Sequence, residues 1–463
     1  MTITRRGFIG ASIGAAAVAG LSACGGDKTP AGGPTSTAGA PGGGDAFPAG
    51  TMTFFGYGQP QWLMEYYNAW LERNRSIAPE VTLAMVQTES EADARQKLIQ
   101  ALSAGDTKSA ADVIQTGRVS MLDMAKNGVL VDMTDYLRSI EDKLVPGALS
   151  DSEYDGKLYG MPDSVRPQLV FYNNEIFEKY GIDPESLATM EGYLEAGRKL
   201  KTDSKGEVQL SQVDPSTFAW RYWGRRGLLP QAKAQIWGDD GAIVFGENEG
   251  TRKALEFFGT LHTEGHLHVT KMFQAPLYEA INAGKIATFY IGAFMDEFLR
   301  GNVADMSGKW RVRSAPVFDG IGLGGAPVIG MSCAVNKDGA PYAGLWQKLY
   351  NDFHFDAAAR EAWTTDMVAQ NAPYANPIAT ELLADPFWKE PAEFYGGQSF
   401  REAESAGLEN PSPNLRVTKD DAEADALISP EIEKFVAGAQ SIDDAIKNAD
   451  AALKNRIGQT DAA

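Results

Sequence analysis

The chain has 463 residues, of which 61 are acidic and 42 are basic, so its formal net charge at pH 7 is −19. A surface this acidic repels phosphate backbones, which argues against a nucleic-acid partner. The length exceeds what one hydrophobic core usually serves and predicts two or three domains. With only two cysteines, neither a disulfide framework nor a cysteine-based metal site is expected.

The first 23 residues have the three parts of an export signal. Arg5 and Arg6 precede the uncharged run "GFIGASIGAAAVAGLSA", residues 7–23, which is too short and too rich in Gly and Ala for a membrane-spanning helix. The paired arginines followed by "GFI" resemble a twin-arginine export motif, and "LSAC" resembles a lipobox. We therefore expect residues 1–23 to be a signal peptide and Cys24 to be lipidated. The alternative is an uncleaved N-terminal helix.

Residues 24–50 are dense in Gly, Pro, Ser and Thr and have almost no apolar side chains. Such a segment cannot bury enough surface to order itself, so it is predicted to be a flexible tether. A lipid anchor with a tether would hold a folded domain at the outer face of the membrane, with no segment spanning it.

Beyond residue 50 the pattern predicts an α/β chain. Strands are expected at residues 51–58 and 81–88, and residues 60–74 between them have helical spacing, which implies a parallel crossover unit. Further helices are predicted at residues 91–105, 120–137, 185–201, 249–265, 275–284, 341–359, 378–384 and 420–456, and short strands at 111–117, 286–292, 311–317 and 328–336.

Residues 156–183 carry a family resemblance. "GKLYGMP" followed by "LVFYNNEIFEKYGID" resembles the signature of family 1 extracellular solute-binding proteins, the substrate-capturing lipoproteins of carbohydrate ABC importers. Further matches occur in the family's order and span nearly all of residues 50–457, except residues 385–419, which match no family segment. These matches are "ADVIQTGRVSMLDMAKNGVLVDMTDYL", "INAGKIATFYIGAF", "VIGMSCAVNKDGAPYAGLWQKLYNDF" and "FVAGAQSIDDAIKNADAALKNRI".

The resemblance implies a periplasmic-binding-protein-like fold, in which two α/β lobes close on a ligand and the chain crosses between them three times. The resemblance implies that residues 163–168 are the first crossing, and Pro162 and Pro167 would make this segment stiff and extended. The others are expected at residues 322–328 and 370–378. The N-terminal lobe would comprise residues 50–162 and 329–370, and the C-terminal lobe residues 169–322 and 378–463.

The resemblance also implies the function. The chain would be a monomeric, extracytoplasmic subunit that captures a mono- or oligosaccharide and presents it to the permease subunits of an ABC transporter. It would need no cofactor or metal and would catalyse no reaction.

A sugar site needs polar groups for the hydroxyls and aromatic rings for the C–H faces of the sugar. In open α/β sheets such groups gather where strands end. The predicted ligand-binding residues are Tyr57, Gln59, Gln87, Gln115, Thr116, Arg118, Asp163, Arg166, Trp220, Tyr222, Trp223, Phe294 and Tyr374.

Each of these predictions has a structural alternative. Asp163 and Arg166 would form a salt bridge in a surface turn, and any single aromatic would be a core residue. The aromatics of "WRYWGRR", residues 220–226, cannot all enter one core beside three arginines, so part of this cluster is expected at the surface or at the cleft.

Other functions remain open. The arginines of residues 220–226 leave room for a phosphorylated or acidic solute. An exported carbohydrate-active enzyme would need a pair of carboxylates that the sequence does not identify, and an adhesion lipoprotein would need no ligand cavity. His262, His266 and His268 have a spacing found in zinc sites, but Gly265 between them is typical of a helix end.

Overall fold

The computed structural model describes residues 46–57, 60–145, 147–363, 378–381 and 386–458, all within one unit of the chain, Thr37–Ala463. The predicted signal peptide, Cys24, Gln59 and Tyr374 lie outside these ranges. None of the helices within them is both long and apolar enough to cross a membrane.

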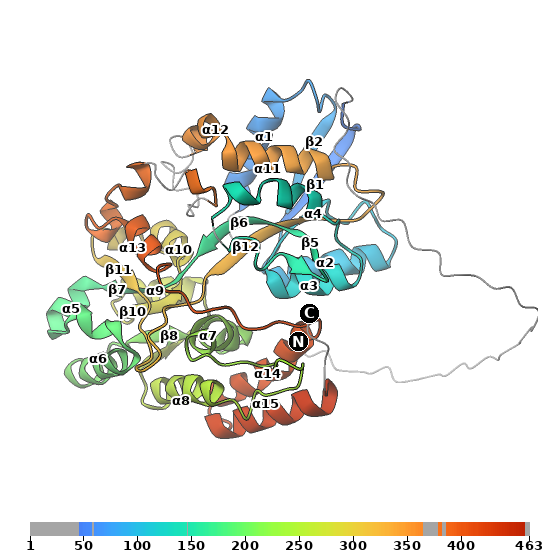
Figure 1. Cartoon of the computed structure of the whole chain (residues 1–463). Helices are drawn as coiled ribbons and strands as arrows, with labels where there is room; N and C mark the ends of the chain where they lie inside the picture. The colour runs from blue at the N-terminus through green and yellow to red at the C-terminus, as the bar shows by residue number, and fades with distance from the viewer. Residues whose placement is uncertain (1–45, 58–59, 146, 364–377, 382–385, 459–463) are drawn as a thin grey trace, which may run out of the picture. The chain divides into compact units, whose positions relative to one another are not determined.

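The first sheet has five strands in the order β2-β1-β3-β12-β6 (Figure 1). β1 pairs in parallel with β2, with Gly50 opposite Val81, and α1 (Pro60–Arg73) connects them. The predicted parallel crossover unit is therefore confirmed. β12 runs antiparallel to both β3 and β6. The strands of this sheet are β1 (Gly50–Gly56), β2 (Val81–Gln87), β3 (Val113–Thr116), β6 (Gly160–Arg166) and β12 (Val328–Ala334).

Helices cover both faces of the first sheet. Phe54 and Phe55 are consecutive in β1 and therefore point to opposite faces. Phe54 belongs to a core that contains Trp70 of α1, and Phe55 to a core that contains Leu98 of α2. Cys333 is buried in the second of these cores, as expected for a packed thiol. The helices around this sheet are α1, α2 (Glu91–Ser103), α3 (Arg118–Lys126), α4 (Thr134–Ser139) and α11 (Ala343–Phe355).

The second sheet has three antiparallel strands in the order β10-β7-β11. Val170 and Phe171 of the central strand point to opposite faces and belong to different cores. Each sheet thus has its own pair of cores, which makes the chain a two-lobed α/β protein, as predicted. The strands are β7 (Gln168–Asn173), β10 (Thr288–Gly292) and β11 (Trp310–Ser314).

The chain passes from the first sheet to the second at a single residue. Arg166 is the last residue of β6, Gln168 is the first of β7, and Pro167 alone stands between them. The second passage, residues 315–327, runs from β11 to β12. It comes so close to the first that a Cβ at Gly325 would lie 2.2 Å from the Cβ of Gln168, so only glycine fits there. The predicted third crossing lies almost wholly outside the described residues, and the predicted lobe boundaries stay a prediction.

Residues 411–420, here called the strap, contact the cores of both lobes. Leu415 is buried in a core of the second lobe, whereas Val417 is buried in the first-lobe core that contains α2 and α3. Asn414 donates to the carboxylate of Asp151 at 3.4 Å. Residues 411–419 of the strap belong to the region 385–419 that matched no family segment, and their placement shows that this part of the region joins the two lobes.

The remaining elements complete the two lobes. The helix predicted at residues 185–201 begins only at Met190, because Pro184–Ala188 forms a 3-10 turn. The other elements are η1 (Glu141–Lys143), β4 (Glu153–Tyr154), β5 (Lys157–Leu158), α5 (Asn174–Tyr180), α6 (Met190–Asp203), β8 (Ser211–Val213), the π-helix η3 (Ala219–Leu228), α7 (Leu229–Gln231), α8 (Glu249–Thr263), β9 (Leu267–Val269), α9 (Ala275–Asn282), α10 (Met295–Asn302), η4 (Ala304–Met306), α12 (Ala357–Ala362), η8 (Pro386–Lys389), η9 (Glu393–Tyr395), α13 (Phe400–Ala406), α14 (Asp421–Val436) and α15 (Ile442–Arg456).

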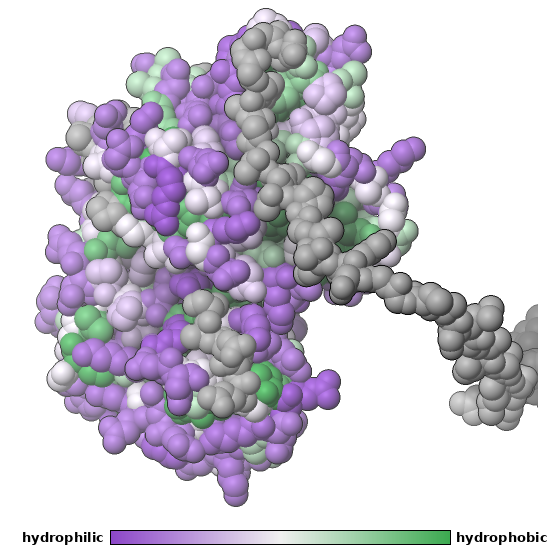
Figure 2. All heavy atoms as spheres, turned by 45° about the vertical axis from the view of Figure 1, so that its right-hand side comes forward, coloured by the Kyte–Doolittle hydropathy of each residue, from purple (hydrophilic) through white to green (hydrophobic). Residues whose placement is uncertain are grey.

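The face of the molecule drawn in Figure 2 is hydrophilic. On the face in Figure 2, polar and charged residues dominate and apolar residues form small scattered groups. Among the described residues, the large hydrophobic side chains classed as exposed are Val86 and Val269. Apolar residues scattered in this way need no partner to cover them.

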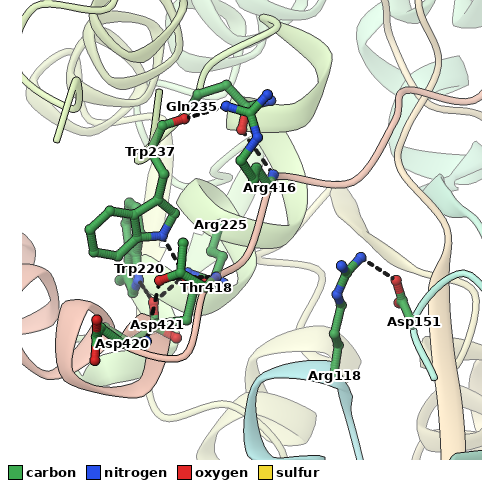
Figure 3. Close-up of polar contacts among 11 residues, drawn as sticks. Arg118, Asp151, Trp220, Arg225, Gln235, Trp237, Arg416, Thr418, Asp420 and Asp421 are labelled. Atoms are coloured by element: carbon green, nitrogen blue, oxygen red, sulfur yellow. Dashed lines mark hydrogen bonds and ion pairs between the residues drawn. The ribbon is translucent and has the colours of Figure 1, made fainter. Parts of the chain in front are cut away.

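The end of the strap is held by Asp421, whose substitution should destabilise the protein. This buried carboxylate accepts from the Thr418 amide at 2.8 Å and from the Trp237 indole, and it pairs with Arg225 (Figure 3). Asp421→Ala leaves the Thr418 amide and the Trp237 indole unmatched and leaves Arg225 with Asp425 alone. We therefore expect a loss of about 3 kcal/mol in the free energy of unfolding, measured by urea denaturation. Asp239→Ala removes a 94% exposed partner of Arg416 and should cost less than about 1 kcal/mol. Equal losses in the two variants would contradict this account.

Candidate ligand-binding site

A cavity of about 460 Å³, here called the aromatic cavity, is lined by residues of both lobes. Its volume falls in the range typical of small-molecule sites. The predicted ligand-binding residues that line it are Tyr57, Gln87, Gln115, Asp163, Arg166, Tyr222 and Phe294.

The first-lobe side of the cavity is formed where parallel strands end. Tyr57 directly follows β1, Gln87 is the last residue of β2, and Gln115 lies near the end of β3. The Tyr57 amide donates to the Gln115 side-chain oxygen at 3.2 Å. Burial, with Glu91 nearby, raises the pKa of Tyr57, so its hydroxyl stays protonated and can donate a hydrogen bond. Parallel strands bring these polar groups to one edge of the sheet, as predicted.

The second-lobe side is a wall of aromatic rings. Tyr222 contacts Phe218 and Phe294 at ring-centroid distances of 5.3 and 5.9 Å, and Phe273 packs on Phe298 at 4.2 Å. All five rings line the cavity and are only partly buried. Phe273 has a φ of 59°, a backbone conformation that is costly for a non-glycine residue and often occurs at functional sites. Sequence reasoning missed Phe218, Phe273 and Phe298. Phe218 stands two residues before the quoted cluster, whereas "KMFQAP" around Phe273 has no periodic signal.

Asp163 in β6 is a partly buried carboxyl group, and among the described residues no lysine or arginine pairs with it. Burial raises the pKa of Asp163 to about 7, although the Ser332 hydroxyl, which donates to it at 3.1 Å, lowers the pKa. His354 lies 3.9 Å away, but burial holds its pKa well below the ordinary value, so it is neutral. Asp163 therefore exchanges its proton near neutral pH.

Arg166 pairs with Glu297 of α10, which belongs to the other lobe. Burial raises the pKa of Glu297, and the charge of Arg166 opposes this rise. The nitrogen Nη1 of Arg166 is buried without a hydrogen-bond partner among the described residues. The alternative of a salt bridge between Asp163 and Arg166 is wrong, because each side chain has its own partner on another element.

Glu91, the first residue of α2, lies between the lobes, and sequence reasoning missed it. Its carboxylate accepts from the Gly117 amide at 3.0 Å and pairs with Arg221 and, at 3.5 Å, with Arg226 of the π-helix η3. Although burial raises the pKa of Glu91, the two arginines, Ser120 and the Gly117 amide lower it to about 2. The group is therefore ionised throughout the neutral range. We call Glu91, Arg221 and Arg226 the partition.

Trp220 and Trp223 do not line the aromatic cavity. Trp223 is 4% exposed, packs in a second-lobe core and donates its indole N–H to the carbonyl of Gln212 at 2.9 Å. Trp220 is 1% exposed and donates to Asp425 at 2.7 Å. The prediction that these indoles bind the ligand is wrong, because η3 turns both of them into the core while Arg221, Tyr222 and Arg226 reach the cavity.

A second cavity of about 510 Å³, here called the arginine cavity, lies beyond the partition. Arg118, predicted to bind the ligand, lines this cavity instead and pairs with Asp151 at 3.0 Å. In Figure 3 this pair lies at the right, and Trp220 and Arg225, which also line the arginine cavity, lie at the left. Thr116, also predicted, is buried and donates its hydroxyl to the Gly117 carbonyl at 3.3 Å, so it lines neither cavity.

The three neighbouring histidines each have separate surroundings. His262 packs on Phe435, His266 contacts Glu264 at 2.9 Å and His268 contacts Gln209 at 3.1 Å. In the part of the chain that the structure describes, no three His, Cys, Asp or Glu side chains come together in a way that could hold a metal ion.

Two α/β lobes that join through short passages and line one cavity define the class of two-lobed binding proteins. The family model described as "Bacterial extracellular solute-binding protein" matches residues 76–315. The chain belongs to this family.

Similar proteins agree with this assignment. An arabinooligosaccharide-binding protein of Halalkalibacterium halodurans is 23% identical over 255 residues, which cover 50% of this chain and 55% of that protein. Its namesake in Bacillus subtilis is 25% identical over 219 residues, covering 43% and 46%. The chain thus spans about half the length of the curated relatives it matches.

Solved structures share the fold. The ABC transporter associated binding protein of B. animalis subsp. lactis, in complex with β-1,6-galactobiose, has a TM-score of 0.75 at 20% identity and covers 89% of this chain and 99% of its own. The ABC substrate-binding protein of Listeria monocytogenes, in complex with cycloalternan, has a TM-score of 0.70 at 19% identity and covers 89% and 100%.

The raised pKa of Asp163 predicts a pH-dependent effect of Asp163→Asn. The folded protein keeps this proton up to about pH 7, whereas the unfolded chain loses it near pH 4. The carboxyl group therefore contributes stability below pH 4 that is lost as the pH rises through 7. Asparagine does not titrate. The free energy of unfolding of the variant, relative to that of wild type, should therefore rise across this pH range by up to about 4 kcal/mol. Urea denaturation of both proteins without ligand from pH 4 to 8 measures this difference, and a constant difference would contradict the assignment.

Proposed function

We propose that this protein is the substrate-binding subunit of an ABC importer and that it captures a neutral oligosaccharide by closure of its two lobes. Ligand contacts to both lobes would favour the closed form, and the two short passages around Pro167 and Gly325 would absorb the rotation. The protein would act as a monomer, without a cofactor and without turnover, and would deliver the ligand to the permease subunits.

The composition of the aromatic cavity is the observation that carries this proposal. One lobe contributes a wall of five rings, which suits the C–H faces of a sugar. The other lobe contributes side-chain amides and the carboxyl group of Asp163, which can form hydrogen bonds with the hydroxyls. The unmatched Nη1 of Arg166 beside the cavity costs about 1–3 kcal/mol, and a ligand hydroxyl oxygen would relieve this cost.

The charges at the cavity favour a neutral ligand over an acidic one. Arg166 is paired with Glu297, and Arg221 is paired with Glu91. These arginines already have anionic partners, so an anionic ligand would have to compete with carboxylates held at short range. This argument weakens the alternative of a phosphorylated or acidic solute, which the sequence left open.

The relatives support the same ligand class. The curated relatives in Halalkalibacterium halodurans and Bacillus subtilis bind arabino-oligosaccharides by name, and the two similar structures hold a galactobiose and a cycloalternan. We therefore propose short neutral oligosaccharides, arabino-oligosaccharides among them, as the first candidates. Micromolar capture corresponds to about −8 kcal/mol, which stacked rings and a few hydrogen bonds can supply.

A thermal-shift screen followed by calorimetry tests the function. We expect at least one neutral arabino-, galacto- or malto-oligosaccharide to stabilise the protein, by about 2.7 kcal/mol at 100 times its Kd, and galacturonate oligomers and glycerophosphodiesters to have no effect. Tyr222→Ala should weaken the binding at least tenfold, because it removes the central ring of the aromatic wall.

The matched control is Tyr180→Ala, which truncates a tyrosine at the end of α5 outside the aromatic cavity and should leave Kd unchanged. Stabilisation by the acidic compounds alone would overturn the proposed ligand class. Cleavage products after incubation with a bound oligosaccharide would overturn the assignment as a binding protein in favour of a carbohydrate-active enzyme.

We further propose that the mature protein is held at the outer face of the cell membrane by lipid on Cys24. The support is the lipobox-like "LSAC" after an export signal of twin-arginine type, followed by a tether rich in Gly and Pro. Cys24→Ala should move the protein from the membrane fraction to the soluble extracytoplasmic fraction. Immunoblotting of the fractions measures this shift, and a variant that stays with the membrane would contradict the lipid anchor.

A further inference from the structure

The two cavities share a boundary. Glu91, Arg221 and Arg226 line both the aromatic cavity and the arginine cavity, together with Gly117, Val328 and Ile329. Of these shared residues, the three of the partition have long charged side chains. The arrangement of these side chains therefore decides whether the two spaces are separate or continuous.

The partition is assembled from both lobes. Glu91 stands at the start of α2, beside the first residues of α3, and its carboxylate is fixed there by the Gly117 amide and by Ser120. Arg221 and Arg226 come from η3 of the second lobe. The carboxylate is 6% exposed, so the ion pairs lie in a protected environment where they are screened little by salt.

The π-helix is what brings both arginines to one carboxylate. In an α-helix, residues five positions apart point about 140° away from one another. In a π-helix the hydrogen bonds join residues five apart, so positions 221 and 226 stand about one turn apart on the same side. Arg226 also lies over the ring of Tyr222, with its guanidinium carbon 5.9 Å from the ring centroid, which joins the partition to the aromatic wall.

The space behind the partition suits the same kind of ligand. The arginine cavity is lined by Asn414 and by the Arg118–Asp151 pair, and thus by groups that can form hydrogen bonds with the hydroxyls of a sugar. With volumes of about 460 and 510 Å³, each cavity alone has the size of a small-molecule site. Without the partition, the combined space would accept a longer saccharide.

We infer that Glu91, Arg221 and Arg226 are specificity-determining residues that end the ligand cavity and so limit the length of the saccharide that the closed protein accepts. This inference rests on the proposed function as an oligosaccharide-binding protein. The partition keeps the arginine cavity from the ligand, and a chain too long for the aromatic cavity would have to break ion pairs between the lobes in order to bind.

The test compares ligand lengths in wild type and in the variant Glu91→Gln/Arg221→Ala/Arg226→Ala. The glutamine keeps an oxygen that can accept from the Gly117 amide, and removal of all three charges leaves no buried ion unpaired. Kd is measured by calorimetry for neutral oligosaccharides of two to eight residues, from the series that stabilises wild type. We expect the ratio of the Kd of the hexasaccharide to the Kd of the disaccharide to be at least tenfold lower in the variant than in wild type. An equal loss of affinity at all lengths would overturn the inference, because it would mean that the ion pairs only stabilise closure.

Glu264→Gln is the matched control. Glu264 accepts from Arg198 at 2.8 and 2.9 Å, and Arg198 with His266 lowers its pKa to about 2, the same value as for Glu91. Its partners lie in the same lobe, so this variant should keep the wild-type length preference. Arg226→Ala alone, which leaves the pairing of Glu91 with Arg221, should give an intermediate preference and serves if the triple variant does not fold.

The two proposals fail in different ways. If wild type binds none of the saccharides, the proposed function fails. The partition is then tested by the crystal structure of the triple variant without ligand, in which one continuous cavity should replace two. Two cavities that stay separate there, or an unchanged length preference in a variant that binds saccharide, would overturn the partition.

Discussion

The passage of the main chain through Pro167 is the constraint on which the arrangement of the two lobes depends. One residue separates the last residue of a strand in the first sheet from the first residue of a strand in the second, and proline fixes the φ of that residue. The Pro167 carbonyl accepts from the Ala293 amide at 2.8 Å, and the second passage contacts the first at Gly325. Because β6 leads directly into this passage, Asp163 and Arg166 are carried to the cavity by the backbone that joins the lobes.

The parts of the site that the sequence predicted are those with local causes. The family resemblance of residues 156–183 located the first crossing, and parallel pairing puts Tyr57, Gln87 and Gln115 at one edge. The cluster at 220–226 could not be resolved in this way, because helical pattern reasoning assumes 3.6 residues per turn, whereas this segment is a π-helix. In this geometry the indoles of Trp220 and Trp223 pack in the core, whereas Arg221 and Arg226 reach Glu91.

The strap and the partition escaped prediction for a different reason, namely that their contacts join residues far apart in the chain. Leu415 and Val417 are two positions apart but pack in cores of different lobes, and nothing in the sequence around them indicates either partner. In the sequence, Glu91 resembles an ordinary acidic residue in the first turn of a helix, where the helix dipole would stabilise its negative charge. Only the approach of η3, about 130 residues later in the chain, turns it into the centre of an ion cluster.

The formal charge of the chain counts every acid as ionised, but the carboxyl groups around the first crossing do not all fit that count. Burial raises the pKa of Asp163 to about 7 and that of the fully buried Glu404 to about 8. Glu297 stays beside Arg166, and Glu91 stays ionised between two arginines. At this site Glu91 is thus kept ionised by two arginines, whereas burial favours the protonated forms of Asp163 and Glu404. An acidic protein can in this way line its cavity with groups whose charges are balanced, which suits a ligand recognised by hydroxyls and ring faces.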